Sequence, residues 1–287
     1  MTVRSLRDRL DLCSINTATL GHKDPIERVI DEVARRGFGG ICPWRCDLEG
    51  RDVGAVARRI RDAGLAVSGY CRSTYLPALA AEAFEANVED NLRAIDQAAE
   101  LSAACFVMVV GSLPPGSRDL ARARSQVAEG AARMLDHARK AGVRLALEPL
   151  HPMYANDRSC LNTIAQALDL ADAIEPFGTR LPDLGLALDV YHVWWDPALS
   201  EAIARAGAAR RIFAFHVCDW LAPTRDFLTD RGMMGDGVVD IAAIRALVEA
   251  AGYQGQVEVE IFSDRDWWTR APGETLAVCA ERLMSVC

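Results

Sequence analysis

The sequence predicts an α/β protein that folds as one (β/α)8 barrel, a TIM barrel, over residues 1–287. Three observations predict this fold. Short apolar stretches alternate with amphipathic stretches along the whole chain, eight of each in strict order. Polar side chains follow the predicted strands, whereas turn residues such as Gly64 and Gly142 precede them. The chain length suits one such barrel, which typically takes about 250 residues.

The elements follow from these patterns in chain order. Strands are expected at residues 10–16, 38–43, 65–71, 105–110, 143–148, 184–189, 212–217 and 256–262. Helices are expected at 25–36, 53–63, 80–102, 118–140, 160–175, 198–208, 240–251 and 273–285. Asp240 is placed to cap the helix at 240–251, and Gly252 is placed to end it. An open doubly wound sheet is the alternative, but CSINTATLGH after the first strand has no glycine-rich phosphate turn.

Composition excludes several classes of function. The net charge of −8 and the scattered arginines provide no basic track for a nucleic-acid partner. No apolar run approaches the ~18 residues that a membrane span needs, and the N-terminal segment lacks the apolar centre of a signal peptide. Nine cysteines, an odd number, indicate reduced thiols. We therefore expect no membrane partner and a cytoplasmic location. Cys42 and Cys46 form a C-x3-C pair, for which no histidine neighbour is evident.

Four predicted strands end in a metal-ligand residue type, at Glu148, Asp189, His216 and Glu260. The carboxyl ends of barrel strands meet on one face, so these side chains are expected to converge on one cation. Three carboxylates and one imidazole suit a hard divalent ion such as manganese, magnesium or cobalt. The alternative is that each is a buried polar residue satisfied by backbone or by an arginine. Glu258 shares the face of Glu260 but lies deeper, where it could pair with His216.

Two histidines, His151 and His192, each follow a proposed ligand by three residues, in EPLH and DVYH. Substrate contact, a general base and support of a ligand are the functional interpretations, and a surface-loop histidine is the alternative. Two other residues at strand exits, Trp44 and Asp219, are candidates for substrate binding. Arg231 or Arg225, in a loop expected near the rim, could neutralise a substrate oxyanion. Five further tryptophans could form a wall for a sugar or could pack between loops: Trp194, Trp195, Trp220, Trp267 and Trp268.

With these residues in view, the chain resembles the xylose-isomerase-like barrels. This superfamily includes sugar-phosphate isomerases, ketose epimerases, inosose dehydratase and an abasic-site endonuclease branch. The resemblance covers roughly residues 10–285, and its matching segments are LALEP, LALDVYH, FHVCDW, GMMGDGVVDI and GYQGQVEVEIF. It implies one divalent metal ion, usually manganese, held by Glu148, Asp189, His216 and Glu260.

Three departures narrow this resemblance. The endonuclease branch uses extra histidines on early strands to hold three zinc ions, and CPWRC, YCRS and VVGS contain none. Ketose epimerases carry an arginine six residues after the strand-seven histidine, where this chain has Ala222, which puts simple ketose C3-epimerase specificity in doubt. The EPLHP segment also resembles barrel subunits of enzymes that cleave 3-keto-glycosides by elimination. There, the residue equivalent to His151 is thought to act as the base, and a second type of subunit is often present.

The expected function is a divalent-metal-dependent sugar isomerase or epimerase. A proton would leave the carbon next to a carbonyl, with Glu148 and Glu260 on opposite sides as ligands and acid/base groups, and the metal would stabilise the enediolate. One alternative is a lyase or dehydratase that acts by elimination on a keto sugar or 3-keto-glycoside with His151 as base. Another is a non-catalytic sugar-binding barrel that keeps the metal. The expected partner is a small carbohydrate, and the sequence is compatible with a homo-oligomer or a second subunit.

Overall fold

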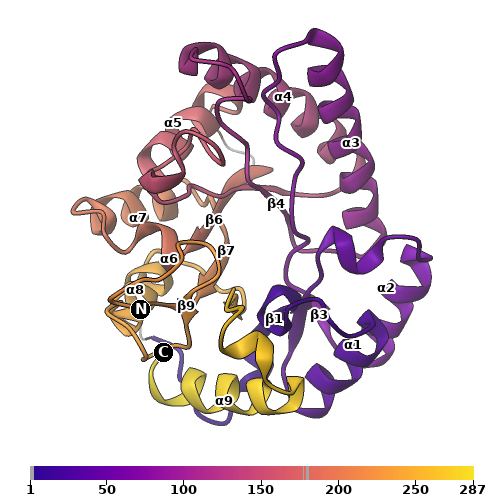
Figure 1. The fold of residues 1–287 in the computed structure, drawn as a ribbon, viewed down its shortest axis with the longest axis vertical. Coiled ribbons are helices and arrows are strands. Elements are labelled where there is room, and N and C mark those ends of the chain that lie inside the picture. Colours follow the sequence, from indigo (N-terminus) through magenta and orange to yellow (C-terminus); the bar gives the residue numbers. More distant parts are fainter. Residues whose placement is uncertain (1–2, 177, 179–180) are drawn as a thin grey trace.

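A ring of eight parallel strands surrounded by helices forms the centre of the computed structural model, which describes residues 3–176, 178 and 181–287 (Figure 1). Each predicted strand contains an observed one. The strands are β1 (Cys13–Asn16), β2 (Gly40–Cys42), β3 (Ala66–Val67), β4 (Phe106–Met108), β5 (Leu145–Leu147), β6 (Leu184–Asp189), β7 (Ile212–Val217) and β10 (Val257–Val259). The (β/α)8 prediction is confirmed.

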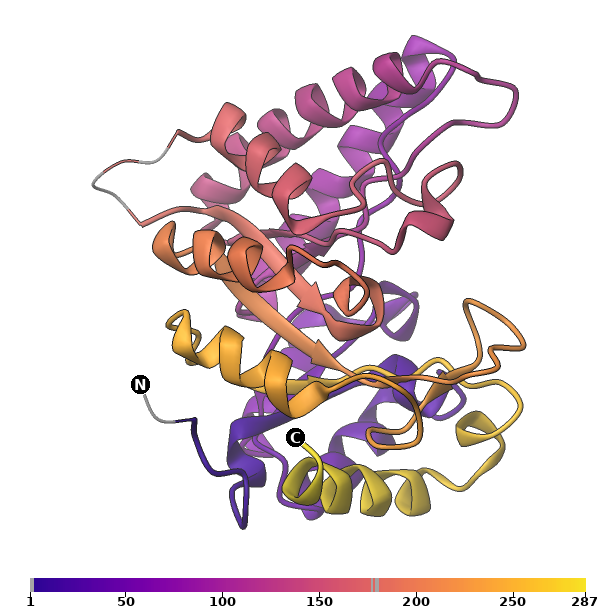
Figure 2. The same cartoon turned by 90° about the vertical axis from the view of Figure 1, so that its left-hand side faces the viewer.

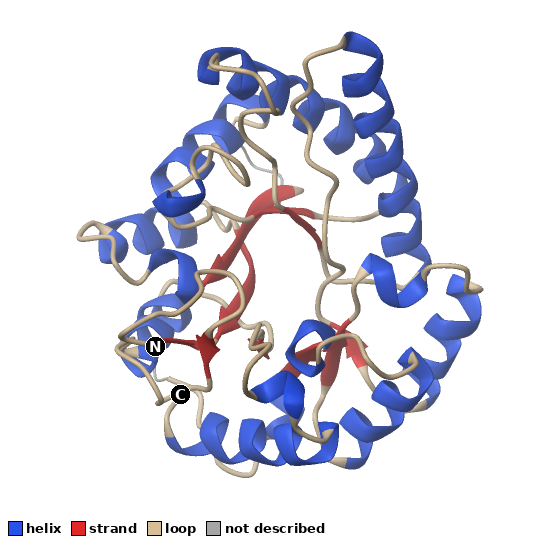
Figure 3. Cartoon of the chain, in the orientation of Figure 1, coloured by secondary structure: helices blue, strands red, loops and turns tan. Residues whose placement is uncertain are grey.

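Helices cover the outside of this ring, as Figure 3 shows by secondary structure. They are α1 (Ile26–Arg35), α2 (Val53–Asp62), α3 (Ala81–Glu100), α4 (Leu120–Ala141), α5 (Ile164–Ile174), α7 (Leu199–Ala208), α8 (Ile241–Ala250) and α9 (Pro272–Ser285). Asp240 caps α8 as predicted, because its Oδ1 accepts the N–H of Ala243 at 3.0 Å. Helix α5 begins later than predicted, because Thr163 caps it by accepting the N–H of Gln166.

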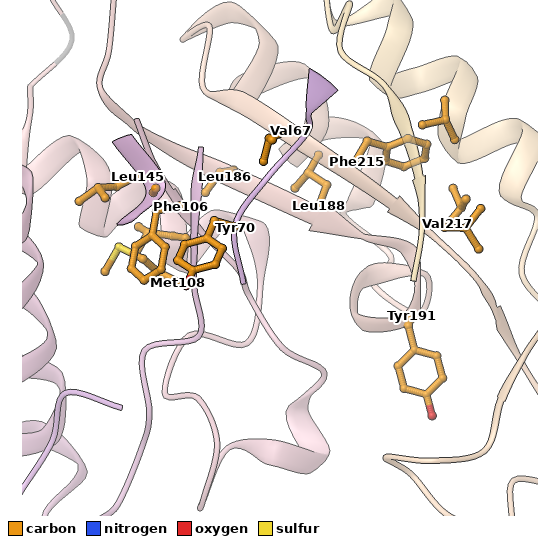
Figure 4. Close-up of a cluster of buried hydrophobic side chains, with 14 of the residues drawn as sticks. Val67, Tyr70, Phe106, Met108, Leu145, Leu186, Leu188, Tyr191, Phe215 and Val217 are labelled. Atoms are coloured by element: carbon orange, nitrogen blue, oxygen red, sulfur yellow. The ribbon is translucent and has the colours of Figure 1, made fainter. Parts of the chain in front are cut away.

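The strand ring closes between β3 and β4. The sheet order is β3-β2-β1-β10-β7-β6-β5-β4, so a closed barrel requires a bond between the two outer strands. Tyr70 provides it: its N–H donates to the carbonyl of Cys105, and its carbonyl accepts the N–H of Val107, both at 3.0 Å. Figure 4 shows the rings of Tyr70 and Phe106 side by side at this seam. Strand β3 is shorter than predicted, yet the chain beyond it still completes the ring.

The two faces of each strand pack into different layers. Successive side chains of a strand point to opposite faces. On β5, Leu145 and Leu147 pack outward against the helices, whereas Ala146 points into the barrel with the equally small Ala187 and Ala214 of β6 and β7. The outer layer, part of which is drawn in Figure 4, supplies most of the apolar burial. The small inward residues leave room inside the barrel for polar side chains.

The carboxyl ends of the strands carry the longer connections. Figure 2 shows the arrows of β6 and β7 pointing toward the end of the barrel where these loops gather. Two short elements in these loops were not predicted. One is helix α6 (Val190–Val193), and the other is the antiparallel pair β8 (Asp219–Trp220) and β9 (Arg231–Gly232). Among the described residues, no helix has the length and apolar character needed to cross a membrane.

Candidate metal centre

The candidate metal centre consists of Glu148, Asp189, His216 and Glu260. Each lies at or directly after the carboxyl end of a strand, on β5, β6, β7 and β10 respectively. One ligand atom from each residue lies within 4.8 Å of the ligand atoms of the other three, and all four side chains are buried. The structure therefore brings together four residues that are far apart in the sequence.

Two buried polar atoms of the centre test whether its residues fit a metal ion. Nδ1 of His216 lies 3.5 Å from Oε1 of Glu148 and 3.7 Å from Oε2 of Glu260. Within the described part of the chain, that nitrogen and Oε1 of Glu148 are buried without a hydrogen-bond partner. A buried polar atom without a partner costs free energy. A divalent cation among three carboxylates and one imidazole would satisfy these atoms, so the residues fit the metal that the sequence predicts.

Glu258 lies one layer deeper, beneath His216, as predicted. Its Oε1 is 3.5 Å from Nε2 of His216, and its Oε2 accepts hydrogen bonds from the hydroxyls of Ser68 at 2.6 Å and Ser14 at 3.3 Å. A carboxylate behind the far nitrogen of a ligating histidine orients the ring and increases its basicity. Nε2 of His216 has no hydrogen-bond partner among the described residues, and Glu258 is the carboxylate placed beside it for such a role.

Asn16 connects the centre to its rim. Its Nδ2 donates to Oε1 of Glu258 and to Oε1 of Glu260, both at 2.9 Å. Its Oδ1 accepts the N–H of Ala18 at 3.1 Å and the indole N–H of Trp44 at 2.6 Å. Both the NH2 group and the oxygen of the Asn16 amide are hydrogen-bonded. Asn16 therefore links Trp44 to Glu260 of the candidate metal centre.

Arg231 reaches the centre from β9. Its Nη1 lies 2.8 Å from Oδ2 of Asp189 and 3.3 Å from Oε2 of Glu260, and the side chain is buried. The guanidinium is held between the rings of Tyr191 and Phe262, at 4.4 and 4.6 Å from their centroids. This cation partly neutralises the carboxylates.

The sequence did not reveal how this arginine reaches the centre. The position where ketose epimerases carry an arginine is Ala222 here, and Arg231 lies nine residues later, at the start of β9. Arg225, the other candidate cation, instead donates from Nε to both carboxylate oxygens of Asp230 at 3.0 Å. The hydroxyls of Tyr154 and Tyr191 donate to the carbonyl of Phe227 at 2.6 and 2.8 Å, and thereby anchor the loop.

An inner cavity of about 120 Å³ opens beside the metal centre. Five of the predicted site residues line it: Trp44, Glu148, His192, Arg231 and Glu260. Residues that sequence reasoning did not assign to the site also line it, among them Arg72, Tyr154, Arg158 and Phe262. An outer groove of about 870 Å³ shares Trp44 and Arg72 with this cavity. The two spaces thus meet at a common wall.

His192 supports a ligand as well as lining the cavity. Its Nδ1 accepts the backbone N–H of His151 at 3.3 Å, and its Nε2 lies 3.7 Å from Oδ2 of Asp189. Burial lowers the pKa of His192 to about 3, so its ring is neutral near pH 7. Nε2 of His192 also lies 3.4 Å from Nη2 of Arg231, so the ring contacts both members of the Asp189–Arg231 pair.

His151 lies outside the lining of the inner cavity. Its ring packs against Trp220 and Trp195, with centroids 5.0 and 5.5 Å away, and its Nδ1 accepts the N–H of Met153 at 3.2 Å. Burial lowers the pKa of His151, which keeps the ring neutral at pH 7. The role of His151 as a base stays a prediction.

Asp219 also lies away from the cavity wall. Its oxygens accept backbone N–H groups of Trp220 at 2.8 Å, Gly235 at 2.9 Å and Val239 at 3.0 Å. These contacts anchor the loop before α8, and the substrate contact expected of Asp219 stays a prediction. Of the tryptophans, Trp44 lines the cavity, whereas Trp220 stacks on Tyr191 at 4.7 Å and packs between loops.

A second group of potential ligands lies at the rim and corrects one sequence-based statement. His22 lies beside Cys46 and Asp47, so Cys46 does have a histidine neighbour. Asp47 is already engaged, because its Oδ1 is 2.8 Å from Nδ1 of His22 and its Oδ2 accepts the hydroxyl of Thr17 and the N–H of Trp44. Through these hydrogen bonds, Asp47 stabilises the turn at Trp44.

The two glutamates on the cavity wall differ in proton affinity. Burial, reinforced by the charge of Glu260, raises the pKa of Glu148 to about 7. Burial also opposes ionisation of Glu260, but His216 and Arg231 outweigh it and lower the pKa of that carboxyl below its ordinary value. Near pH 7, one carboxyl can hold a proton while the other is ionised.

A model of the xylose isomerase-like TIM barrel family matches residues 30–281. The chain belongs to this family. Among solved structures, a protein from Sinorhizobium meliloti 1021 is 48% identical to this family member, with a TM-score of 0.93, over 97% of this chain and 99% of that chain. The close agreement extends over the whole barrel.

Curated relatives of this xylose isomerase-like barrel are more distant. An L-ribulose 3-epimerase from Mesorhizobium japonicum is 28% identical over 266 residues, which cover 89% of this chain and 82% of that relative. An inosose isomerase from Halalkalibacterium halodurans is 28% identical over 128 residues, which cover 44% of this chain. That match spans 42% of the length of the inosose isomerase, so less than half of that protein is represented.

Proposed function

We propose that the protein is a divalent-metal-dependent sugar isomerase or epimerase that moves a proton at the carbon next to a carbonyl. The observation that carries this proposal is the placement of Glu148 and Glu260. Both belong to the metal centre and both line the inner cavity, whereas their strands, β5 and β10, are separated by β6 and β7 in the sheet. Two carboxyl groups can therefore approach one bound substrate from different sides.

Glu148, Asp189, His216 and Glu260 would hold the metal, with manganese expected and magnesium or cobalt as alternatives. When bound, such a cation polarises a carbonyl oxygen and stabilises negative charge that develops on it. The chain itself provides further positive charge through Arg231, which lies between Asp189 and Glu260 on the cavity wall.

The positions of the two glutamates suit acid/base work, because they face the inner cavity from different strands. His216 and Arg231 favour the ionised form of Glu260, which can accept a proton from substrate carbon. Glu148 is assigned the return of a proton on the other side. Each positioned acid or base typically contributes a factor of about 10²–10⁴ in rate.

The names of the relatives support the same class of reaction. The L-ribulose 3-epimerase and the inosose isomerase are both named for isomerisation of a sugar or a polyol-derived ketone. Elimination from a keto-glycoside remains the alternative, but it requires a base at the substrate, and His151 lies off the cavity wall. A non-catalytic sugar-binding barrel would need no acid/base pair.

Exchange of substrate C–H for deuterium in heavy water tests the proposal. The manganese-loaded protein should introduce deuterium next to the carbonyl of a keto sugar, whereas a binding barrel would introduce none. Glu148→Gln and Glu260→Gln should each lower the exchange rate at least about a hundredfold. Glu82→Gln, an exposed residue on α3, is the matched control and should leave it unchanged. If the protein instead releases an eliminated group from a keto-glycoside, and His151→Gln abolishes that release, the result would support the lyase.

A further inference from the structure

Three arginines line the inner cavity, and they differ in their partners. Arg231 is committed to Asp189 and Glu260. Arg72 and Arg158 have no carboxylate within ion-pair distance among the described residues, although both are only partly exposed. Most other arginines near these spaces are neutralised. Two of them are Arg45, which pairs with Asp90 at 2.8 Å, and Arg51, which pairs with Glu27 at 2.5 Å.

Both unpaired arginines are positioned by a tyrosine ring. The guanidinium carbon of Arg72 lies 4.6 Å from the ring centroid of Tyr75, and that of Arg158 lies 5.4 Å from the centroid of Tyr154. Such a contact engages the face of the guanidinium and leaves N–H groups on its edge available. Arg72 uses Nη1 to donate to the carbonyl of Ser73 at 3.0 Å, which fixes it further.

The lining of the inner cavity leaves these two cations without a carboxylate of their own. The three carboxylates of the metal centre and the deeper Glu258 carry −4, of which a divalent ion together with Arg231 would offset three charges. The remaining charge, on Glu258, lies behind His216 and outside the cavity lining. The positive charges of Arg72 and Arg158 then have no counterpart in the cavity wall. The planar guanidinium is the side chain best matched to a carboxylate or phosphate, because it can donate two parallel hydrogen bonds.

We propose that Arg72 and Arg158 form an anion subsite, and that the substrate is a keto sugar derivative carrying a carboxylate or phosphate group. This inference deepens the proposed function and rests on it. The reacting carbonyl would lie at Glu148 and Glu260, and the anionic group would lie toward the mouth. Arg72 stands in the wall shared with the outer groove, so the rest of a longer substrate has about 870 Å³ to occupy. A neutral sugar would leave both arginines unpaired.

Binding of matched ligands to the manganese-loaded protein tests this subsite by calorimetry. The probes are D-fructose, D-fructose 6-phosphate, 5-keto-D-gluconate, inorganic phosphate and acetate. We expect one anionic keto sugar to bind at least about tenfold more tightly than D-fructose. Arg72→Ala and Arg158→Ala should each lower the affinity for that anionic sugar much more than the affinity for D-fructose, and so remove most of the preference. Arg61→Ala, an exposed arginine on α2, is the control and should change neither affinity.

The outcomes separate the subsite from the reaction. Equal affinity for neutral and anionic probes would overturn the subsite, and so would a preference that persists in the double variant, which would place the anion on the metal. The preferred sugar distinguishes phosphate from carboxylate as the natural group. Deuterium exchange is measured on the same samples. An anion preference without exchange refutes the proposed reaction alone, and exchange of D-fructose without an anion preference refutes the subsite alone.

Discussion

Nη1 of Arg231 lies 2.8 Å from Oδ2 of Asp189, so a fixed positive charge of the chain touches a residue that the sequence assigns to the metal. The same nitrogen lies 3.3 Å from Oε2 of Glu260. The guanidinium therefore belongs to the electrostatics of the centre as well as to the cavity wall. This relationship makes the metal and the arginine interdependent.

Arg231→Met should destabilise the metal-free protein by about 3–5 kcal/mol, because removing one partner leaves buried carboxylates without a counter-charge. Added manganese should recover much of that loss, since it supplies positive charge to the same oxygens. Chemical denaturation with and without the ion measures both effects. Arg225→Met, which breaks a half-exposed pair with Asp230, is the control. An equal loss with and without metal would contradict the interdependence.

Glu258→Gln should weaken metal binding by about 10–100-fold, although residue 258 is not a ligand, because it removes the carboxylate behind His216. The amide is nearly the same size, and the hydroxyls of Ser14 and Ser68 can still find an acceptor. Calorimetric titration of the apoprotein with manganese gives the ratio. A loss of affinity as large as that of Asp189→Asn would show that Glu258 itself is a ligand.

Metal affinity should rise with pH, with a steeper slope below about pH 7. Burial raises the pKa of Glu148 to about 7, while burial opposes the charge on His216 but Glu258 and Glu148 raise its pKa well above the ordinary value. Both groups hold protons in the metal-free protein and must release them to bind a cation. The pH-dependence of calorimetric affinities counts these protons. In Glu148→Gln, the metal affinity should no longer depend more steeply on pH below about pH 7.

The same pKa shift predicts how the stability of the apoprotein depends on pH. The pKa of Glu148 is raised above its unfolded value, so the folded state binds the extra proton between about pH 4.5 and 7. Its contribution to stability is complete below that window and is lost as the pH rises through it. Urea denaturation of the apoprotein at several pH values measures the trend, and Glu148→Gln should flatten it. A contribution that increases across the window would contradict the shift.

Gly185→Ala should destabilise the barrel, because the new Cβ would lie 2.5 Å from the carbonyl oxygen of Arg211 and 2.6 Å from the ring of Phe213. Overpacking of this kind costs about 1–3 kcal/mol. Gly273→Ala on α9 is the matched control, because its Cβ would have no neighbour closer than 3.5 Å. Thermal denaturation should separate the two variants by several degrees.

Sequence reasoning grouped the four residues of the candidate metal centre, because each follows an apolar stretch and the barrel topology brings strand ends together. Glu148 and Glu260 could be placed this way without any tertiary information. The position of Glu258 beneath His216 also followed, from the period of two along a strand. These inferences depend on regular geometry, which a sequence pattern encodes well.

The surroundings of the centre could not be predicted in the same way. Arg231 reaches Asp189 through the two-residue strands β8 and β9, which are too short to leave a periodic pattern. The carboxylate of Asp219 accepts backbone N–H groups of the loop that follows it, and its place after a strand does not predict these contacts. Phe262 is the last residue of the strand predicted at 256–262, and that position was the available signal for it.

The anchored carbonyl of Phe227 has a consequence for how substrate reaches the metal. Two tyrosine hydroxyls from different loops hold this one oxygen, and the next residue, Leu228, lines the inner cavity. The loop that carries Leu228 is therefore fixed at two points, and we do not expect it to open as a lid. The opposite approach, past Trp44 and Arg72, leads in from the large groove, so molecules should enter and leave along that path.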